Sequence, residues 1–217
     1  MSKRKPDSIS IEKSKLLIVE GNDEVQVFGA LLKSLGRTDV QVLGIGGKTK
    51  IRANLEALIR AARFRSVDTL VIVRDADYSE ASAGPESSAA QSAWTSVCDA
   101  LRNVQIPVPT EHGVLSPGHP RTAIFLCPDG VSEGMLEDVC LKAVAADRAS
   151  ACVAQYFQCL AGVGMVPAQN DRAKAWMHAF LASRPAPDVR LGEAAAKGYL
   201  PFGDAAFAPI VALPQAM

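Results

Sequence analysis

The sequence lacks an excess of charge of either sign. Its 217 residues include 23 Lys and Arg and 23 Asp and Glu, so the formal net charge at pH 7 is zero. A protein that coats nucleic acid through summed phosphate contacts needs a strong positive excess. The composition therefore argues against that class, although it still leaves room for a local basic face.

Long hydrophobic runs are absent as well. The apolar runs are far shorter than the roughly 20 residues that span a membrane, and no apolar segment follows the polar start Met-Ser-Lys-Arg-Lys-Pro. We therefore expect a cytoplasmic protein with no membrane partner. Residues 1–13, with their basic cluster Lys3, Arg4 and Lys5, predict a loose arm or an edge strand. Hydrophobic residues still make up 48% of the chain, which is enough for a sizeable core.

Cysteine and histidine are sparse and lack metal-binding spacing. The five cysteines include no Cys-x-x-Cys pair, and the three histidines are not spaced as metal ligands. Scattered thiols of this kind fit a reducing compartment. Cys127 and Cys140 lie in apolar stretches, where a buried, inert thiol is expected rather than a nucleophile.

What the sequence does contain is an alternation of short aliphatic runs with amphipathic segments. The predicted strands cover residues 16–19, 40–43, 69–73 and 122–127. The predicted helices that follow them cover residues 23–35, 51–62, 94–101 and 134–146. Continuous aliphatic runs are typical of strands buried on both faces. The alternation predicts an α/β fold that is Rossmann-like, with a central, mainly parallel sheet flanked by helices.

The C-terminal third has a different composition. It is rich in Ala, and it predicts helices over residues 151–160, 171–181 and 192–200. Before it, residues 79–90 are rich in Ser, Ala, Gly and Pro and predict a flexible loop. We therefore divide the chain into an α/β domain over residues 1–148 and a C-terminal helical extension over residues 149–217 that packs on it.

Acidic residues follow the predicted strands. Glu20 follows the first, Asp75 and Asp77 follow the third, and Asp129 follows the fourth. Sites in parallel α/β sheets form beyond the carboxyl ends of the strands, so Glu20, Asp75 and Asp77 are expected to converge. Like charges this close raise one another's pKa unless a cation intervenes. A Mg²⁺ or Mn²⁺ ion with oxygen ligands and substrate phosphates would suit phosphoryl or phosphodiester chemistry.

Each of these acids also has a structural interpretation. Asp23 and Asp129 are expected to serve as a helix cap and a turn residue. Asp75 and Asp77 face the same side only if the strand continues through both. Glu137 and Asp138 open a predicted helix, where they could either function or simply compensate the helix dipole.

A glycine turn precedes the second predicted helix. Gly46, Gly47 and Lys48 invite a P-loop interpretation, but Val42 stands where the first glycine of that motif is needed. A tight turn at a helix N-terminus can still bind a phosphate through its backbone N–H groups, with help from Lys48. Helix capping is the equal alternative.

Three short motifs occur in a fixed order on these elements. They are Val19-Glu20-Gly21, Gly46-Gly47-Lys48 and Asp75-Ala76-Asp77. Over residues 14–146 this pattern resembles the Toprim domain of topoisomerases, DnaG-type primases and the OLD and RecR families. More narrowly, the chain is similar to small stand-alone bacterial proteins of the DUF3226 type. The matching features there are Pro128-Asp129, Gly134-Met135-Leu136-Glu137-Asp138 and a helical tail with Lys174, Trp176 and Leu181.

The resemblance implies roles for individual acids. Glu20 would be a general acid/base or a metal ligand, and Asp75 and Asp77 would bind Mg²⁺ as part of the catalytic set. Glu24 matches the second acid of the Glu-Gly-x-x-Glu variant in OLD-type nucleases, and Glu137 or Asp138 would complete a second metal position. The chain has no nucleophilic tyrosine domain, which argues against a topoisomerase. OLD nucleases also use an ATPase that this chain lacks, so an ATPase or another protein is a conceivable partner.

Two functional hypotheses follow. The first is a Mg²⁺-dependent nuclease or related phosphotransferase. The second is a non-catalytic module that binds nucleic acid, a nucleotide or a protein partner. A haloacid-dehalogenase-like phosphatase is disfavoured, because its nucleophilic Asp follows the first strand and Ser79 replaces the expected Thr or Val. A receiver domain is disfavoured because its paired acids and later Lys are incomplete.

Overall fold

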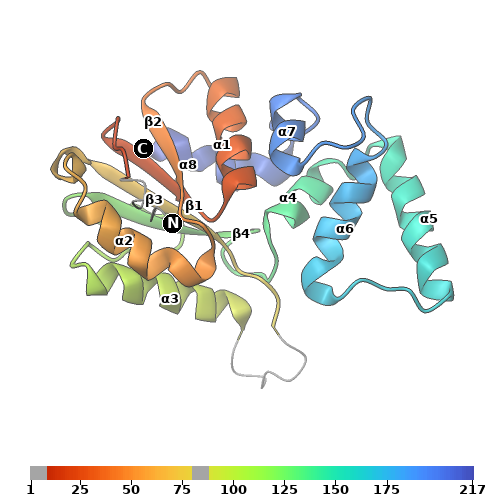
Figure 1. Ribbon diagram of the computed structural model, residues 1–217, viewed down its shortest axis with the longest axis horizontal. Helices are drawn as coiled ribbons and strands as arrows, with labels where there is room; N and C mark the ends of the chain where they lie inside the picture. The colour runs from red at the N-terminus through yellow and green to blue at the C-terminus, as the bar shows by residue number, and fades with distance from the viewer. Residues whose placement is uncertain (1–8, 80–87) are drawn as a thin grey trace, which may run out of the picture.

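The protein is built around one parallel sheet. The structure, a computed structural model, describes residues 9–79 and 88–217. In this part of the chain four parallel strands lie in the order β2-β1-β3-β4. Their bounds are β1 Lys15–Val19, β2 Val40–Gly44, β3 Thr69–Asp75 and β4 Arg121–Cys127. The predicted α/β architecture with a parallel sheet flanked by helices is confirmed (Figure 1).

Helices follow the strands as the periodicity predicts. Their bounds are α1 Asn22–Ser34, α2 Ile51–Ile59, α3 Ala89–Asn103, α4 Leu136–Ala143, α5 Arg148–Gly162, α6 Gln169–Leu181, α7 Leu191–Ala196 and α8 Ala208–Ala216. Three short 3-10 helices are η1 Lys48–Lys50, η2 Phe64–Ser66 and η3 Ala205–Phe207. α8 is not among the predicted helices. It has Pro209 in its opening turn and Pro214 inside it.

Two sequence predictions fall at the edges of this description. The basic cluster Lys3, Arg4 and Lys5 lies outside the described residues, as do residues 80–87 of the predicted loop. Residues 9–13 form no strand. Instead, the Gln41 side chain holds this segment by donating to the Ser10 carbonyl at 2.8 Å and accepting from the Glu12 N–H at 2.7 Å.

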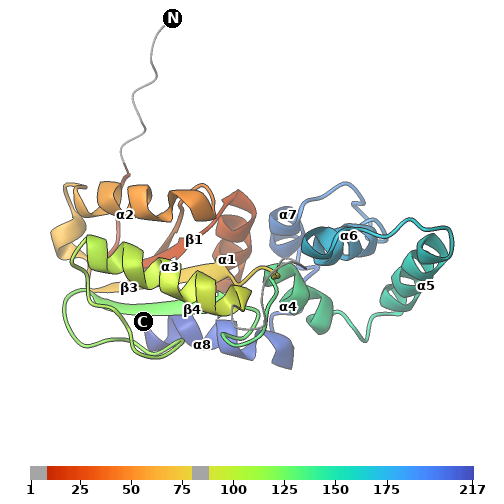
Figure 2. The same cartoon turned by 90° about the horizontal axis from the view of Figure 1, so that it is seen from below.

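The two faces of the sheet carry separate cores, because side chains alternate along each strand. Leu16 and Ile18 of β1 pack with residues of α2 and α3 on one face. Leu17 and Val19 pack with residues of α1, α4 and the C-terminal helices on the other. Figure 2 shows the sheet between α2 and α3 on one side and α8 on the other.

The C-terminal helices complete the second core. Phe207, Ile210 and Leu213 are almost fully buried and belong to the same hydrophobic cluster as Leu17 and Val71 of the central strands. α7 packs on α1, and α6 packs on α4. In Figure 1, α5 and α6 extend to one side of the sheet, whereas α8 lies behind it. Residues 149–217 therefore supply part of the central core as well as an outlying helical pair.

Across residues 9–79 and 88–217, no helix combines the length and the apolar character that crossing a membrane requires.

Candidate functional site

The register of the central strands places Glu20 beside β3. Ile18 pairs with Ile72, so the residue after β1 reaches the end of β3. Glu20 Oε1 accepts a hydrogen bond from the Asp75 N–H at 3.3 Å and lies 3.5 Å from Arg74 Nε. The Glu20 and Arg74 side chains are only 16% and 11% exposed. This ion pair is therefore largely shielded from water.

Asp75 joins the end of β3 to the start of α4. Its Oδ1 accepts a hydrogen bond from the Leu136 N–H at 2.9 Å. Burial raises the pKa of Asp75 well above its usual value, and the charges of Glu137, Glu20 and Glu24 raise it further. The structure thus holds Asp75 among acids that oppose its ionisation.

Two helix N-termini add further acids. Glu24 lies in the first turn of α1, with its carboxylate over Gly21, where an added Cβ would come within 2.9 Å of Oε2. Glu137 lies in the first turn of α4. Burial raises the pKa of Glu137, the Lys174 charge lowers it and the Glu24 charge raises it. We call Glu20, Glu24, Asp75 and Glu137 the acidic edge.

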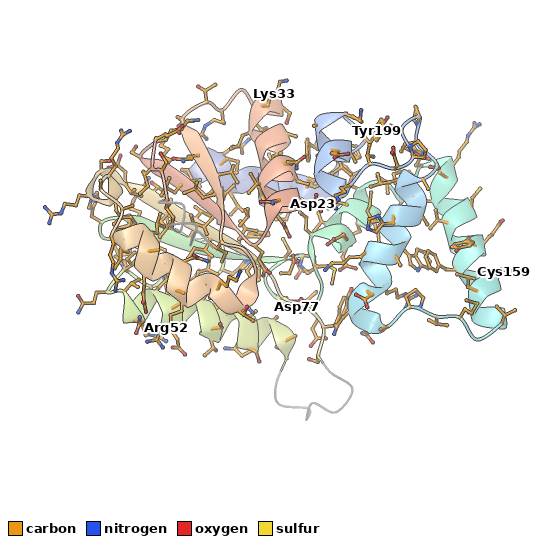
Figure 3. All side chains as sticks on the ribbon, viewed as in Figure 1. Asp23, Lys33, Arg52, Asp77, Cys159 and Tyr199 are labelled. Atoms are coloured by element: carbon orange, nitrogen blue, oxygen red, sulfur yellow. The ribbon has the colours of Figure 1, made fainter. Side chains whose placement is uncertain are left out.

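Asp77 does not share a strand face with Asp75. β3 ends at Asp75, and Asp77 has a φ of 60° in the left-handed region. The Asp77 N–H donates to the Gly134 carbonyl, and the Gly134 N–H donates to the Asp77 carbonyl, both at 2.8 Å. The strand does not continue through Asp77, so Asp75 and Asp77 do not share a strand face. The Asp77 charge still raises the pKa of Glu20. Figure 3 shows Asp77 near the junction of the sheet and the C-terminal helices.

Burial is the largest influence on Glu20 itself. It raises the pKa of Glu20, the Arg74 charge lowers it, and the Asp77 and Glu24 charges raise it. The net direction is upward, so the one neighbouring guanidinium does not offset burial and the other acids. Arg74 Nε is buried and has no hydrogen-bond partner among the described residues.

Asp138 has a structural role that distinguishes it from Glu137. Its Oδ2 accepts from the Met135 N–H at 2.8 Å, which closes the N-terminus of α4. Its Oδ1 accepts from the Tyr78 hydroxyl at 2.8 Å, and burial together with this bond raises the pKa of Tyr78. Asp138 therefore has a local structural role at the start of α4, whereas Glu137 belongs to the acidic edge, and the metal-binding role of both residues stays a prediction.

The other two strand-end acids behave as local structure. Asp129 accepts from the N–H groups of Val131 and Ser132 at 3.0 and 2.7 Å, as a turn residue does. Burial alone would raise the pKa of Asp129, but these hydrogen bonds lower it overall. The prediction that Asp23 caps α1 is wrong, because Gly21 is the N-cap and no side chain bonds to it. Asp23 instead lies in the first turn, where a carboxylate favours the dipole.

The glycine turn after β2 is tied to β1. Gly46 and Gly47 have φ values of 71° and 103°, which favour glycine. The Gly47 N–H donates to the Glu20 carbonyl at 2.8 Å, so that group is already used. Lys48 begins η1, which precedes α2. The phosphate-binding role of Gly46, Gly47 and Lys48 stays a prediction.

Sequence reasoning missed the cations of the site. Lys174, His178 and Arg190 line a cavity of about 380 Å³ together with Glu24 and Glu137. These basic residues come from α6 and the segment after it, so no local spacing could link them to the acids. Arg74 had a usable signal, because it follows the aliphatic run of β3 directly and must lie near Glu20 in a parallel pair.

The donors at the acidic edge suit a hard divalent cation in kind. Within the described ranges, no three Asp, Glu, His or Cys residues are grouped so that they could hold one ion. Mg²⁺ is usually bound by one or two carboxylates and keeps waters and substrate phosphates as its other ligands. The acidic edge fits that pattern of partial protein ligation, and not that of a closed metal cage.

Fold and site together define an α/β protein with partly buried, mutually repelling carboxylates at the carboxyl ends of its central strands. The chain belongs to the DUF3226 family, whose model, described as "Protein of unknown function (DUF3226)", matches residues 14–213. The match runs through the sheet and the C-terminal helices alike. No curated protein and no solved structure matches the chain.

Proposed function

We propose that the protein uses Mg²⁺ at the acidic edge to act on phosphodiester or phosphoryl groups, as a Toprim-type nuclease or nucleic-acid-processing factor. The observation that carries the proposal is the convergence of three carboxyl groups: Glu20 accepts a hydrogen bond from the Asp75 N–H, and Asp75 accepts one from the Leu136 N–H, directly before Glu137. Each has a raised pKa, and each is acted on by the charges of other acids at the same edge. Clusters of perturbed carboxylates of this kind are concentrated at functional sites.

The residues divide into roles according to their surroundings. Asp75, with Glu24 or Glu137, would hold the metal, since carboxylate oxygens are the ligands Mg²⁺ prefers. Glu20 is suited to move a proton, because a carboxyl with a raised pKa can hold or release one nearer to neutral pH. When bound, the ion would stabilise charge on the reacting phosphoryl oxygens. Asp77 contributes negative charge near Glu20 in this scheme.

The Toprim relationship is part of the proposal. It is supported by the order of the three motifs and by the proximity of Glu20 to Asp75 across neighbouring strands. The bend at Asp77 is a departure, because it separates the two acids of Asp75-Ala76-Asp77.

A non-catalytic module is the second candidate, and Arg74 favours it. Its guanidinium already lies 3.5 Å from Glu20 and partly neutralises the edge without a metal. A protein with such an internal cation could bind nucleic acid, a nucleotide or a protein partner, such as an ATPase, without turnover.

The test measures metal binding and cleavage in parallel. Calorimetry with Mg²⁺ and Mn²⁺ is followed by incubation with labelled single- and double-stranded DNA and RNA. The variants are Asp75→Asn and Glu20→Gln. Asp99→Asn is the matched control, since Asp99 is exposed on α3, away from the acidic edge, and pairs with Arg102. Metal-dependent cleavage that both site variants lose and the control keeps supports the enzyme. Metal binding without cleavage favours the module, and no metal binding refutes the proposal.

A further inference from the structure

The cavity beside the acidic edge has two chemically different walls. One wall is formed by the first turns of α1 and α4 and carries Glu24 and Glu137. The facing wall carries Lys174 and His178 of α6 and Arg190, which precedes α7. Its volume of about 380 Å³ lies within the range of small-ligand sites.

The cations of the second wall are not used by the fold. Lys174, His178 and Arg190 are all exposed, and in the described part of the chain none forms an ion pair with an acid. Several other cations in the described part of the chain do pair with an acid. Arg184, for example, lies 2.9 Å from Asp147. Lys174 and Glu137 line the same cavity, and the Lys174 charge works to lower the pKa of Glu137 against the effect of burial.

The helix that presents these cations is firmly held. Met177, Phe180 and Leu181 of α6 are buried in the core that covers the sheet. The Arg184–Asp147 ion pair ties the segment after α6 to the N-cap of α5. Because one face of α6 is fixed in this way, Lys174 and His178 on its exposed side are kept at the cavity.

We propose that Lys174, His178 and Arg190 bind a phosphate group of the substrate opposite the acidic edge. The inference rests on the proposed function. It specifies which group of the substrate these cations bind, namely a phosphate ester, as in a nucleotide or a nucleic-acid backbone. Guanidinium and ammonium groups form strong charge-assisted bonds to phosphate oxygens. The N-termini of α1 and α4 add positive dipole potential to the same cavity.

The two walls together explain why acids and cations share one cavity. An isolated phosphate would be repelled by Glu24 and Glu137, so Lys174 and Arg190 alone give modest affinity. A divalent cation on the acidic wall removes that repulsion and supplies a further phosphate ligand position. Phosphate binding should therefore be measurable without metal and should tighten when Mg²⁺ is present.

The test is direct binding, with no requirement for turnover. Fluorescence anisotropy of a short 5′-labelled single-stranded DNA and calorimetry with a nucleoside monophosphate and with inorganic phosphate are measured with and without Mg²⁺. The variants are Lys174→Gln, Arg190→Gln and the double substitution. Lys197→Gln is the matched control, because Lys197 is an exposed cation at the C-cap of α7 and does not line the cavity.

Each single substitution is expected to weaken DNA binding about tenfold, and the double about 100-fold. The slope of log K against log salt should fall by about one for each cation removed, whereas Lys197→Gln leaves both quantities unchanged. The three probes separate the sources: tight binding of the monophosphate indicates a nucleotide, and tight binding of the DNA alone indicates a backbone phosphate. Unchanged binding of every probe in the double variant overturns the inference.

The Asp75→Asn variant distinguishes this failure from failure of the proposed function. If it still binds the metal-free probes through Lys174 and Arg190 but the wild type shows no metal effect, the phosphate site stands and the Mg²⁺ proposal fails. If the wild type shows a metal effect and the Lys174→Gln/Arg190→Gln variant binds every probe as tightly as the wild type does, the acidic edge stands and the phosphate site is refuted.

Discussion

The two ends of the parallel sheet treat their carboxylates in opposite ways. At the amino end of the strands, Asp39 accepts from Lys15 Nζ and Arg37 Nε, both at 2.7 Å. These hydrogen bonds hold the pKa of Asp39 far below its usual value. At the carboxyl end, burial and neighbouring acids raise the pKa of Glu20 and Asp75. At the amino end the acid is paired with cations, and at the carboxyl end negative charge is in excess.

The acid at the amino end of the strands contributes to the stability of the fold, whereas the acids at the carboxyl end lower it. Two cations around one exposed acid make a modest contribution to stability. Several partly buried acids around one guanidinium oppose folding instead, because ionising each becomes harder when the others are charged. An arrangement that costs stability is expected where a cation or substrate compensates for it.

The largest expected effect follows from neutralising Asp75. Asp75→Asn keeps an oxygen for the Leu136 N–H but removes a carboxylate from the acidic edge. We expect the Kd for Mg²⁺, measured by calorimetry, to rise by about 10- to 100-fold or more. Without metal at pH 8, the free energy of unfolding should stay the same or rise by about 1 kcal/mol. A variant that keeps wild-type Mg²⁺ affinity contradicts the assignment of Asp75 as a ligand.

Removing Arg74 should have the next largest effect. Arg74→Gln deprives Glu20 of its one adjacent guanidinium and further raises the pKa of Glu20. We expect a loss of about 2 kcal/mol in the free energy of unfolding at pH 8, where Glu20 is forced to ionise beside other acids. At pH 5 the loss should be smaller, because a protonated Glu20 needs no cation. Urea denaturation at both values tests this, and an equal loss at both contradicts it.

The acids at the two ends of the strands should make stability depend on pH in opposite directions. Folding raises the pKa of Asp75, Glu20 and Glu137 above their usual values of 3.8, 4.5 and 4.5. Above about pH 4 the folded state therefore holds more protons than the unfolded state, and stability falls as pH rises, by up to about 1.4 kcal/mol per pH unit for each proton. Asp39 acts in reverse: its stabilisation is present above pH 3.8 and is lost as pH falls further.

Thermal unfolding of metal-free protein across pH 3 to 8 measures both the fall in stability above about pH 4 and the loss at lower pH. Asp75→Asn should flatten only the decline above pH 4, and Asp39→Asn only the loss at lower pH. A decline that is unchanged in Asp75→Asn shows that this acid is not its source.

The smallest effect of a substitution is expected at the amino end of the strands, where Asp39 is paired with cations. Asp39→Asn removes the acceptor of two ion pairs, but its side chain is 46% exposed. We expect a loss of about 0.2–1 kcal/mol at pH 7, reduced further by high salt, and no change in Mg²⁺ affinity. Chemical denaturation at two salt concentrations checks the first expectation, and calorimetry checks the second.

The sequence predicted the sheet because its signals are local. Each aliphatic run, such as residues 69–73, is long enough to show burial on both faces, and each is followed by a turn and a periodic segment. The same logic placed Glu20 and Asp75 at one edge, since parallel strands end together. The geometry at Asp77 depended on one backbone angle, which is set by its pairing with Gly134 from a distant segment.

The other wall of the cavity could not be predicted, because it depends on tertiary packing. Lys174 and Arg190 are far from Glu24 along the chain and meet it only because α6 and α7 pack on α4 and α1. The change in composition led us to treat residues 149–217 as an extension. In the structure, Phe207 and Leu213 of this segment also lie in the core that covers the sheet. No periodicity reports which distant helix will cover a given sheet face.

The burial of Phe207, Ile210 and Leu213 against the face that carries Leu17 has a consequence for how the chain is made. During synthesis β1 emerges from the ribosome well before η3 and α8, which carry these three residues. At roughly 5–20 residues per second, the interval between them is roughly 10–40 s. During that time an apolar strand face is exposed on the nascent chain. The growing protein should therefore bind chaperones readily until α8 has emerged from the ribosome.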